Sequence, residues 1–141
     1  MENYDVMLNN LGTDVRESER LADEADAGTR REKLDKVYGL EELDEMEEDF
    51  WKRATSISET QSKIWRSLLQ VMEDERLNSD KKEVNNAVIE LFELYHRVGV
   101  ASDTLRDARK YLLCRRNTVT AILLREKTAS RISSWIGDEE E

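Results

Sequence analysis

Few residues in this chain have the types and spacing needed for catalysis or metal binding. Glu93 and His96 have the Glu-x-x-His spacing that points two metal ligands from one face of a helix. A ferritin-like di-iron site needs two such motifs, and His96 is the only histidine in the sequence. We therefore expect His96 to be a helix-surface or interface side chain.

Other chemistries find no better support in the sequence. A nucleophilic site would have to use the same histidine, and no nucleophile-elbow motif accompanies any serine or Cys114. The acidic run 41–49 lacks the glycine and ligand spacing of a calcium loop, and acids at the start of a helix stabilise its dipole. There is no Gly-rich phosphate loop. The sequence thus predicts a non-enzymatic protein without metal, cofactor or small-molecule substrate.

The composition indicates the fold class that must carry any functional surface. The 141 residues suffice for one domain, and they include no proline, five glycines and 38% charged residues, which favours long, solvated helices. A single cysteine excludes an internal disulfide, and the N-terminus lacks the pattern of a secretory signal. No stretch approaches the roughly 18 apolar residues of a membrane span. We expect an all-α, intracellular, cytoplasmic protein.

Apolar residues spaced alternately by three and four predict two long helices, over about 41–77 and 81–135. Between them, Asp80 and Glu83 form a capping box, which predicts an antiparallel helical hairpin of coiled-coil type. A second capping box, Ser56 to Glu59, leaves open whether the first helix breaks there.

A two-helix hairpin leaves apolar surface that another helix must cover. Two alternatives remain open from the sequence: dimerisation, or a third helix supplied by residues 1–40. That segment is acidic, and we expect it to be weakly helical or partly disordered; residues 137–141 form an acidic tail. Under the dimer hypothesis, the oligomer interface would consist of Phe50, Ile57, Ile64, Leu68, Val71, Val84, Val88, Leu91, Tyr95 and Val98.

Charge is distributed unevenly along the chain. Residues 1–50 carry 17 acids and six bases, whereas residues 51–137 carry 16 bases and 11 acids. A basic strip follows the second long helix, and its candidate anion-facing or lipid-facing residues are Arg106, Arg109, Lys110, Arg115, Arg116, Lys127 and Arg131. Its partner is either the acidic half of the protein, anionic lipid head groups, or nucleic acid. Nucleic acid is the weakest option, because the protein is acidic overall and the strip lacks aromatic residues.

The stretches DFWKRATSISETQSKIWRSLLQVMEDERL (49–77) and NNAVIELFELYHRVGVASDTLRDARKYLLCRRN (85–117) resemble the helical BAR region of sorting nexins. Ser58-Glu59 matches its Ser-Glu break, residues 91–95 its Leu/Tyr segment, and KYLLCRR at 110–116 its basic stretch. The resemblance implies a divergent module that dimerises through the hairpin and contacts membranes through Arg106, Arg109, Lys110, Arg115 and Arg116. Three long helices are usual in such a module, and only two are evident after residue 40.

These patterns predict an elongated helical interaction protein, whose partners are a second copy or other helical proteins. We expect a dimeric adaptor that associates peripherally with anionic membranes in intracellular trafficking. Two alternatives remain: a scaffold subunit of a larger assembly that makes no lipid contact, and a nucleic-acid-associated helical factor.

Overall fold

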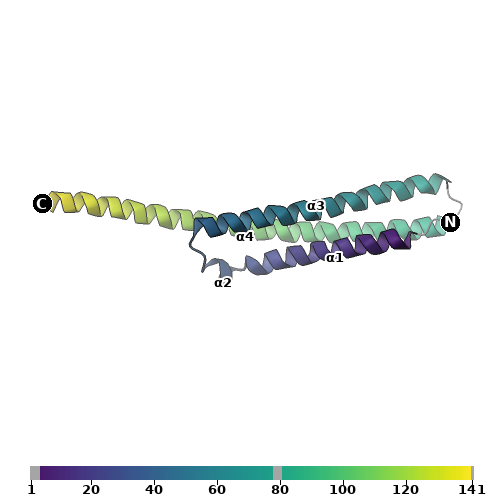
Figure 1. Cartoon of the computed structure of the whole chain (residues 1–141), viewed down its shortest axis with the longest axis horizontal. Coiled ribbons are helices and arrows are strands. Elements are labelled where there is room, and N and C mark those ends of the chain that lie inside the picture. The colour runs from purple at the N-terminus through teal and green to yellow at the C-terminus, as the bar shows by residue number, and fades with distance from the viewer. Residues whose placement is uncertain (1–3, 78–80, 141) are drawn as a thin grey trace.

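The fold was analysed in a computed structural model that describes residues 4–77 and 81–140. Its elements are α1 (Asp5–Gly28), the single-turn α2 (Arg31–Leu34), α3 (Leu40–Leu77) and α4 (Lys81–Glu140). The described residues contain no strand, so the all-α prediction is confirmed. Figure 1 shows the three long helices running side by side as an elongated bundle, from which α4 continues alone.

Helices α3 and α4 form the predicted antiparallel hairpin, with bounds within five residues of those expected from the sequence. Helix α3 is continuous through Ser56–Glu59, so of the two alternatives left open from the sequence the structure has the unbroken helix. Ile57 and Thr60 both face the core, and the nearby Thr55 hydroxyl donates to the Trp51 carbonyl 2.9 Å away. A hydroxyl bonded back to the preceding turn is compatible with a helix interior. The predicted cap, Asp80, lies outside the described residues.

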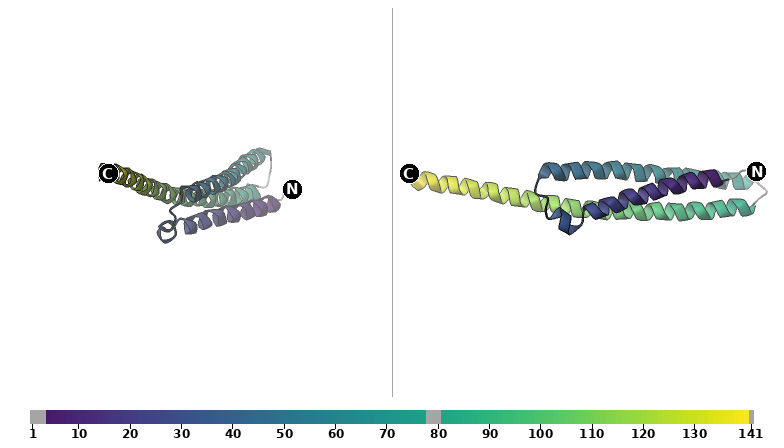
Figure 2. Two further views of the ribbon diagram at one scale, coloured as in Figure 1. Left: turned by 60° about the vertical axis from the view of Figure 1, so that its left-hand side comes forward. Right: turned by 60° about the horizontal axis from the view of Figure 1, so that its bottom comes forward.

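The N-terminal segment, expected to be weakly helical or partly disordered, contains a continuous helix of 24 residues. Helix α1 buries Leu11, Val15, Ser18 and Ala22 at spacings of four, three and four. The last two side chains are small, so this seam shows little hydrophobic signal in the sequence, yet small residues allow helices to pack closely. Of the two ways to cover the hairpin, the structure has the third helix, packed against both α3 and α4 (Figure 2).

The residues assigned to an oligomer interface lie within the chain itself, which corrects that prediction. Phe50, Ile57, Ile64, Leu68, Val71, Val84, Leu91 and Val98 are buried in the shared core of α1, α3 and α4. Val88 and Tyr95 pack at its edge and remain partly exposed. The three-and-four pattern specifies a helix-packing seam, but it does not reveal whether the facing helix belongs to the same chain.

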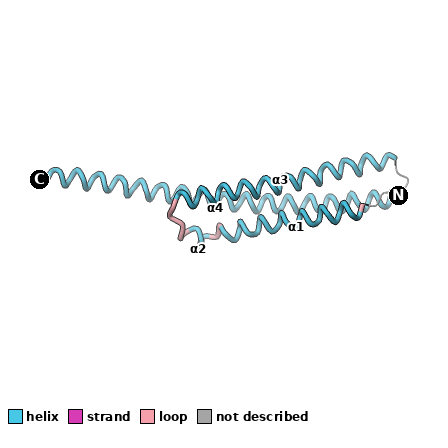
Figure 3. The backbone as a smooth tube through the Cα atoms, in the orientation of Figure 1, coloured by secondary structure: helices cyan, strands magenta, loops and turns pink. Residues whose placement is uncertain are grey.

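Helix α4 is longer than the bundle. A second core cluster closes the bundle where α2 and the start of α3 pack on α4, and no side chain from Thr120 to Gly137 is buried beyond Val119. Residues 120–140, here termed the overhang, extend about 31 Å further at 1.5 Å per residue. Figure 3 shows the overhang as a helix without a neighbour. From Thr120 to Gly137 every side chain but that of Ile122 is exposed.

Truncation of two aliphatic residues of α4, one buried and one exposed, tests which side of the helix forms the core. Leu91→Ala should lower the free energy of unfolding by about 2–5 kcal/mol, because Leu91 is fully buried and its truncation leaves a cavity. Ile89→Ala, two residues away and 56% exposed, should change it by less than about 0.5 kcal/mol. Urea denaturation followed by circular dichroism measures both, and similar losses for the two variants would contradict this core.

Candidate partner-binding surfaces

The middle of the basic strip binds the acidic start of α3. The Arg116 guanidinium lies 2.9 Å from both the Asp44 and the Glu47 carboxylates. Arg109 approaches Glu47 at 3.6 Å and lies over the Trp51 ring, 4.6 Å from its centroid. Three partners were expected for the basic strip: the acidic half of the protein, lipid head groups or nucleic acid. These two arginines contact the first of them, within the same chain.

Arg115 has a structural role in the connection between α1 and α3. Its Nε donates to the Val37 carbonyl at 3.0 Å, and a second nitrogen donates to the Asp35 carbonyl at 3.1 Å. The guanidinium also lies over the Tyr38 ring, and the side chain is only 10% exposed. Arg115 thus satisfies carbonyl groups of a non-helical segment and ties it to α4.

The remaining residues of the strip point to solvent. Arg106 and Lys110 pair with Asp103 and Asp107, one turn back on their own helix, at 3.4 and 3.6 Å. Lys127 and Arg131 lie on the overhang, and none of the described acidic side chains forms an ion pair with them. The structure therefore divides the predicted strip into an internally paired part and an exposed part, and only the latter is available to a partner.

Glu93 and His96 are both exposed on α4. Within residues 4–77 and 81–140 there is no group of three or more His, Cys, Asp or Glu side chains that could hold a metal ion. The same part of the chain contains no helix both long and apolar enough to cross a bilayer.

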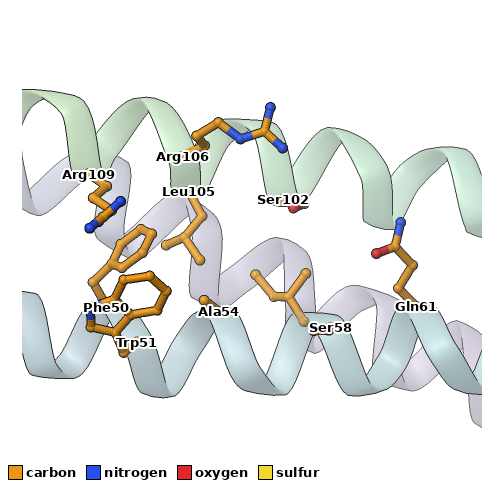
Figure 4. A pocket seen from close by; sticks show the side chains of 10 residues that line it. Phe50, Trp51, Ala54, Ser58, Gln61, Ser102, Leu105, Arg106 and Arg109 are labelled. Atoms are coloured by element: carbon orange, nitrogen blue, oxygen red, sulfur yellow. The ribbon is translucent and has the colours of Figure 1, made fainter.

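A larger candidate surface lies on the α3/α4 hairpin, on the side away from α1. Figure 4 shows one end of it, where a hollow of about 260 Å³ opens between α3 and α4 while α1 passes behind. Arg109 lies beside Phe50 and Trp51 at this end, and Ser58 and Gln61 face Ser102 further along. A second hollow, at the opposite end, is lined by Leu69 and Met72 of α3.

This surface is uncharged between its ends. We call it the hairpin face, and it consists of Trp51, Ser58, Gln61, Trp65, Leu69 and Met72 of α3 and Val88, Phe92, Tyr95, Gly99 and Ser102 of α4. Trp65 and Tyr95 meet across it with ring centroids 5.8 Å apart. A Cβ at Gly99 would have no neighbouring heavy atom within 4 Å, so space remains beside α4.

The side of the bundle that α1 occupies is built differently. Ion pairs attach α1 to the hairpin along its length: Arg53 to Glu24 at 2.9 Å, Lys63 to Asp14 at 3.7 Å, and Arg97 to Glu19. Charges therefore line the edges of the occupied side, whereas the hairpin face has half-exposed aromatic and aliphatic side chains. Such a patch on a chain this rich in charge is typical of a surface that binds another protein.

Half of this surface can be read from the sequence. Trp51, Trp65, Leu69 and Met72 stand beside the core seam of α3 and widen its apolar face. Its counterpart on α4 was missed. The available signal was the absence of charge from Val88, Phe92, Tyr95, Gly99 and Ser102, a row spaced four, three, four and three.

The overhang carries a third candidate surface. An uncharged strip, here termed the overhang strip, contains Ala121, Leu124, Thr128, Ile132 and Trp135. At about 100° per residue, this strip lies roughly opposite the side of α4 that buries Leu112 and Val119. It therefore does not continue the core seam of the bundle. Trp135 is 66% exposed, and Leu124 and Ile132 are also exposed.

Comparison of the chain with models of known protein families, with curated proteins and with solved structures finds no match. The hairpin face, the overhang strip and the exposed cations are therefore the features of the molecule that bear on its function.

Reversal of one charge tests the pairing between Arg116 and the start of α3. Arg116→Glu should lower the free energy of unfolding by about 1 kcal/mol, because Asp44 and Glu47 would then face a like charge. Adding Asp44→Arg should restore part of this loss. Arg106→Glu is the matched control, because Arg106 pairs only with an exposed neighbour on its own helix. Equal losses for Arg116→Glu and Arg106→Glu would contradict the pairing.

The attachment of α1 should respond to acid. Hydrogen bonds from Arg53 and then Arg20 hold the pKa of Glu24 below its ordinary value of 4.5. A lowered pKa in the folded protein means that this carboxylate stabilises the fold above its unfolded-state pKa and loses that contribution as the pH falls through the folded-state value. Arg53→Gln should move the Glu24 pKa toward 4.5, whereas Arg31→Gln should leave it unchanged. Carboxyl NMR titration measures this, and an unaltered Glu24 pKa in Arg53→Gln would refute the contact.

Proposed function

We propose that this protein is a non-enzymatic interaction protein that binds an amphipathic helix of a protein partner on its hairpin face. The observation that carries the proposal is a continuous uncharged surface with three aromatic side chains, Trp51, Trp65 and Phe92, each about half exposed, in a chain with 38% charged residues. Aromatic residues at the centre of an interface commonly supply most of its binding energy.

The shape of this surface favours a helix over other ligands. From Trp51 to Met72 it follows α3 for about 32 Å, which matches a partner helix of some 21 residues. Its side chains repeat every three and four residues on both helices. A further helix can therefore pack along them with the same side-chain spacing that α1 uses on the other side of the hairpin. An uncharged surface also fits the scaffold alternative, in which other proteins cover the hairpin.

A second candidate is the peripheral membrane adaptor suggested by the BAR resemblance. It is favoured by the overhang, where the exposed Arg125, Lys127 and Arg131 accompany exposed Trp135 and Ile136. Each cation near an anionic surface adds about 1 kcal/mol of attraction. However, Arg109, Arg115 and Arg116, which that hypothesis also requires, are engaged inside the chain. Sedimentation with phosphatidylserine vesicles at low and high salt tests this candidate, and wild-type protein that stays in the supernatant at low salt contradicts it.

The helix-binding proposal is tested with a fluorescein-labelled amphipathic peptide of about 18 residues whose apolar side contains leucine and alanine. Anisotropy should report saturable binding, and Trp65→Glu or Phe92→Glu should weaken it at least tenfold, because each places a charge in an uncharged interface. Ile89→Glu is the matched control, since Ile89 is equally exposed on α4 but lies outside the hairpin face.

The tryptophans give a second signal in the same titration. Burial of Trp51 and Trp65 under the peptide should shift their emission to shorter wavelength. Absence of peptide binding, or equal binding to the Trp65→Glu and Ile89→Glu variants, would overturn the proposed function.

A further inference from the structure

Two surfaces of this chain lack a partner, and they suit each other. We propose that the helix bound on the hairpin face is the overhang of a second copy, and that two copies exchange overhangs in an antiparallel dimer with two-fold symmetry. This inference rests on the proposed function, because it names the occupant of the same surface. An overhang cannot reach the hairpin face of its own chain, since α4 runs unbroken away from the bundle (Figure 1).

The two surfaces agree in length. The overhang strip, from Ala121 to Trp135, and the α4 row of the hairpin face, from Val88 to Ser102, each extend about 21 Å. The overhang helix as a whole is about 31 Å long, and the face follows α3 for about 32 Å. An overhang laid on the face would therefore reach from one of its ends to the other. Each end of the resulting dimer would then contain a bundle of four helices, three from one chain and the fourth from its partner.

The two surfaces also agree in polarity and charge. The overhang strip and the hairpin face are both uncharged, so neither would bury an unpaired charge in the other. Within the overhang, residues 120–137 hold three bases and one acid, a net charge of +2, and the acidic residues 138–140 follow at its end. Residues 1–119 carry a net charge of −8, so residues 120–137 are attracted to the acidic bundle of another copy, whereas residues 138–140 are not.

The position of the surfaces on α4 indicates a two-fold dimer. At about 100° per residue, the overhang strip falls within roughly 40° of the row formed by Val88, Phe92, Tyr95, Gly99 and Ser102. When two copies of α4 pack antiparallel, the overhang strip of each copy can therefore contact the hairpin face of the other. Matching the strip's centre, at Thr128, to that of the row, at Tyr95, puts the two-fold axis beside Tyr111 and Leu112, within one helical turn of Cys114. A closed arrangement of this kind uses every overhang and leaves none for further assembly.

The apolar surface available is large enough for a stable dimer. An aromatic side chain contributes about 150–250 Å² when fully accessible, so the half-exposed Trp51, Trp65, Phe92 and Trp135 of two copies offer on the order of 800 Å². Specific interfaces bury about 1,200–2,000 Å² in total, and the aliphatic residues of strip and face add to the aromatic share.

The test uses full-length variants that disable one surface each. Gly99→Arg obstructs the hairpin face without a clash inside the monomer, because the space beside Gly99 is open, and the new charge would be buried against the uncharged overhang strip. Leu124→Glu with Trp135→Glu disables the overhang without disturbing the core, because these side chains are 60% and 66% exposed. Gly99→Ala and Ile89→Glu are the controls for altered helicity and for altered surface charge.

Light scattering should show a dimer for the wild-type protein and both controls, and monomers of unchanged helicity for the two disabled variants. An equimolar mixture of the disabled variants should regain a mixed dimer, weaker than wild type by at least tenfold, because one intact face and one intact overhang remain. A short bis-maleimide should link two wild-type chains through the exposed Cys114, and should fail to link Gly99→Arg chains.

Several results would overturn the exchange. These are a wild-type monomer, a dimer that persists when the overhang is disabled, an open series of larger species, and a wild-type dimer that Cys114 does not cross-link. The labelled peptide distinguishes this failure from failure of the proposed function. If the overhang-disabled chain binds the peptide while the wild type is monomeric, the hairpin face binds helices but its natural occupant is another protein. If neither peptide nor second copy binds, both proposals fall.

Discussion

The buried seam between α3 and α4 is the interaction on which the rest of the structure depends. Ile57, Ile64, Leu68 and Val71 meet Val84, Leu91 and Val98 along it, and nearly all of these side chains are fully buried. Removal of this much apolar surface from water offsets the entropy cost of ordering two helices of 38 and 60 residues. Pairing of α3 and α4 along this seam leaves two sides of the hairpin. Helix α1 covers one of them, and the hairpin face is the other.

The two sides of the hairpin show how a charged chain can direct its own assembly. The ion pairs of α1 lie at the rim of its contact and are partly exposed, so each adds little stability but restricts the register in which α1 can pack. The hairpin face lacks these charges, so no ion pair directs α1 to that side. The hairpin face therefore remains open to a helix that brings its own apolar strip.

The sequence predicted the helices well because the periodicity of apolar residues is a strong and local signal. It predicted the role of the seam poorly. Leu91 has the same neighbours in sequence whether it packs against its own chain or a second one. The seam of α1 decides between the two, and it gives a weak signal because it includes the small residues Ser18 and Ala22. Similarly, Arg109, Arg115 and Arg116 formed part of a uniform strip in sequence, but the first half of the chain folds over them and leaves Lys127 and Arg131 exposed.

The continuity of α4 restricts how this protein can change through evolution. No loop separates the buried seam ending at Val119 from the strip that begins at Ala121, so both surfaces turn together as one rigid rod. Insertion of one residue near their junction would rotate everything beyond it by about 100° and advance it by 1.5 Å. Length changes there should be tolerated only in steps near seven residues, which restore the original facing. The direction in which the overhang strip faces therefore depends on the length of α4 as much as on the identity of the side chains in the strip.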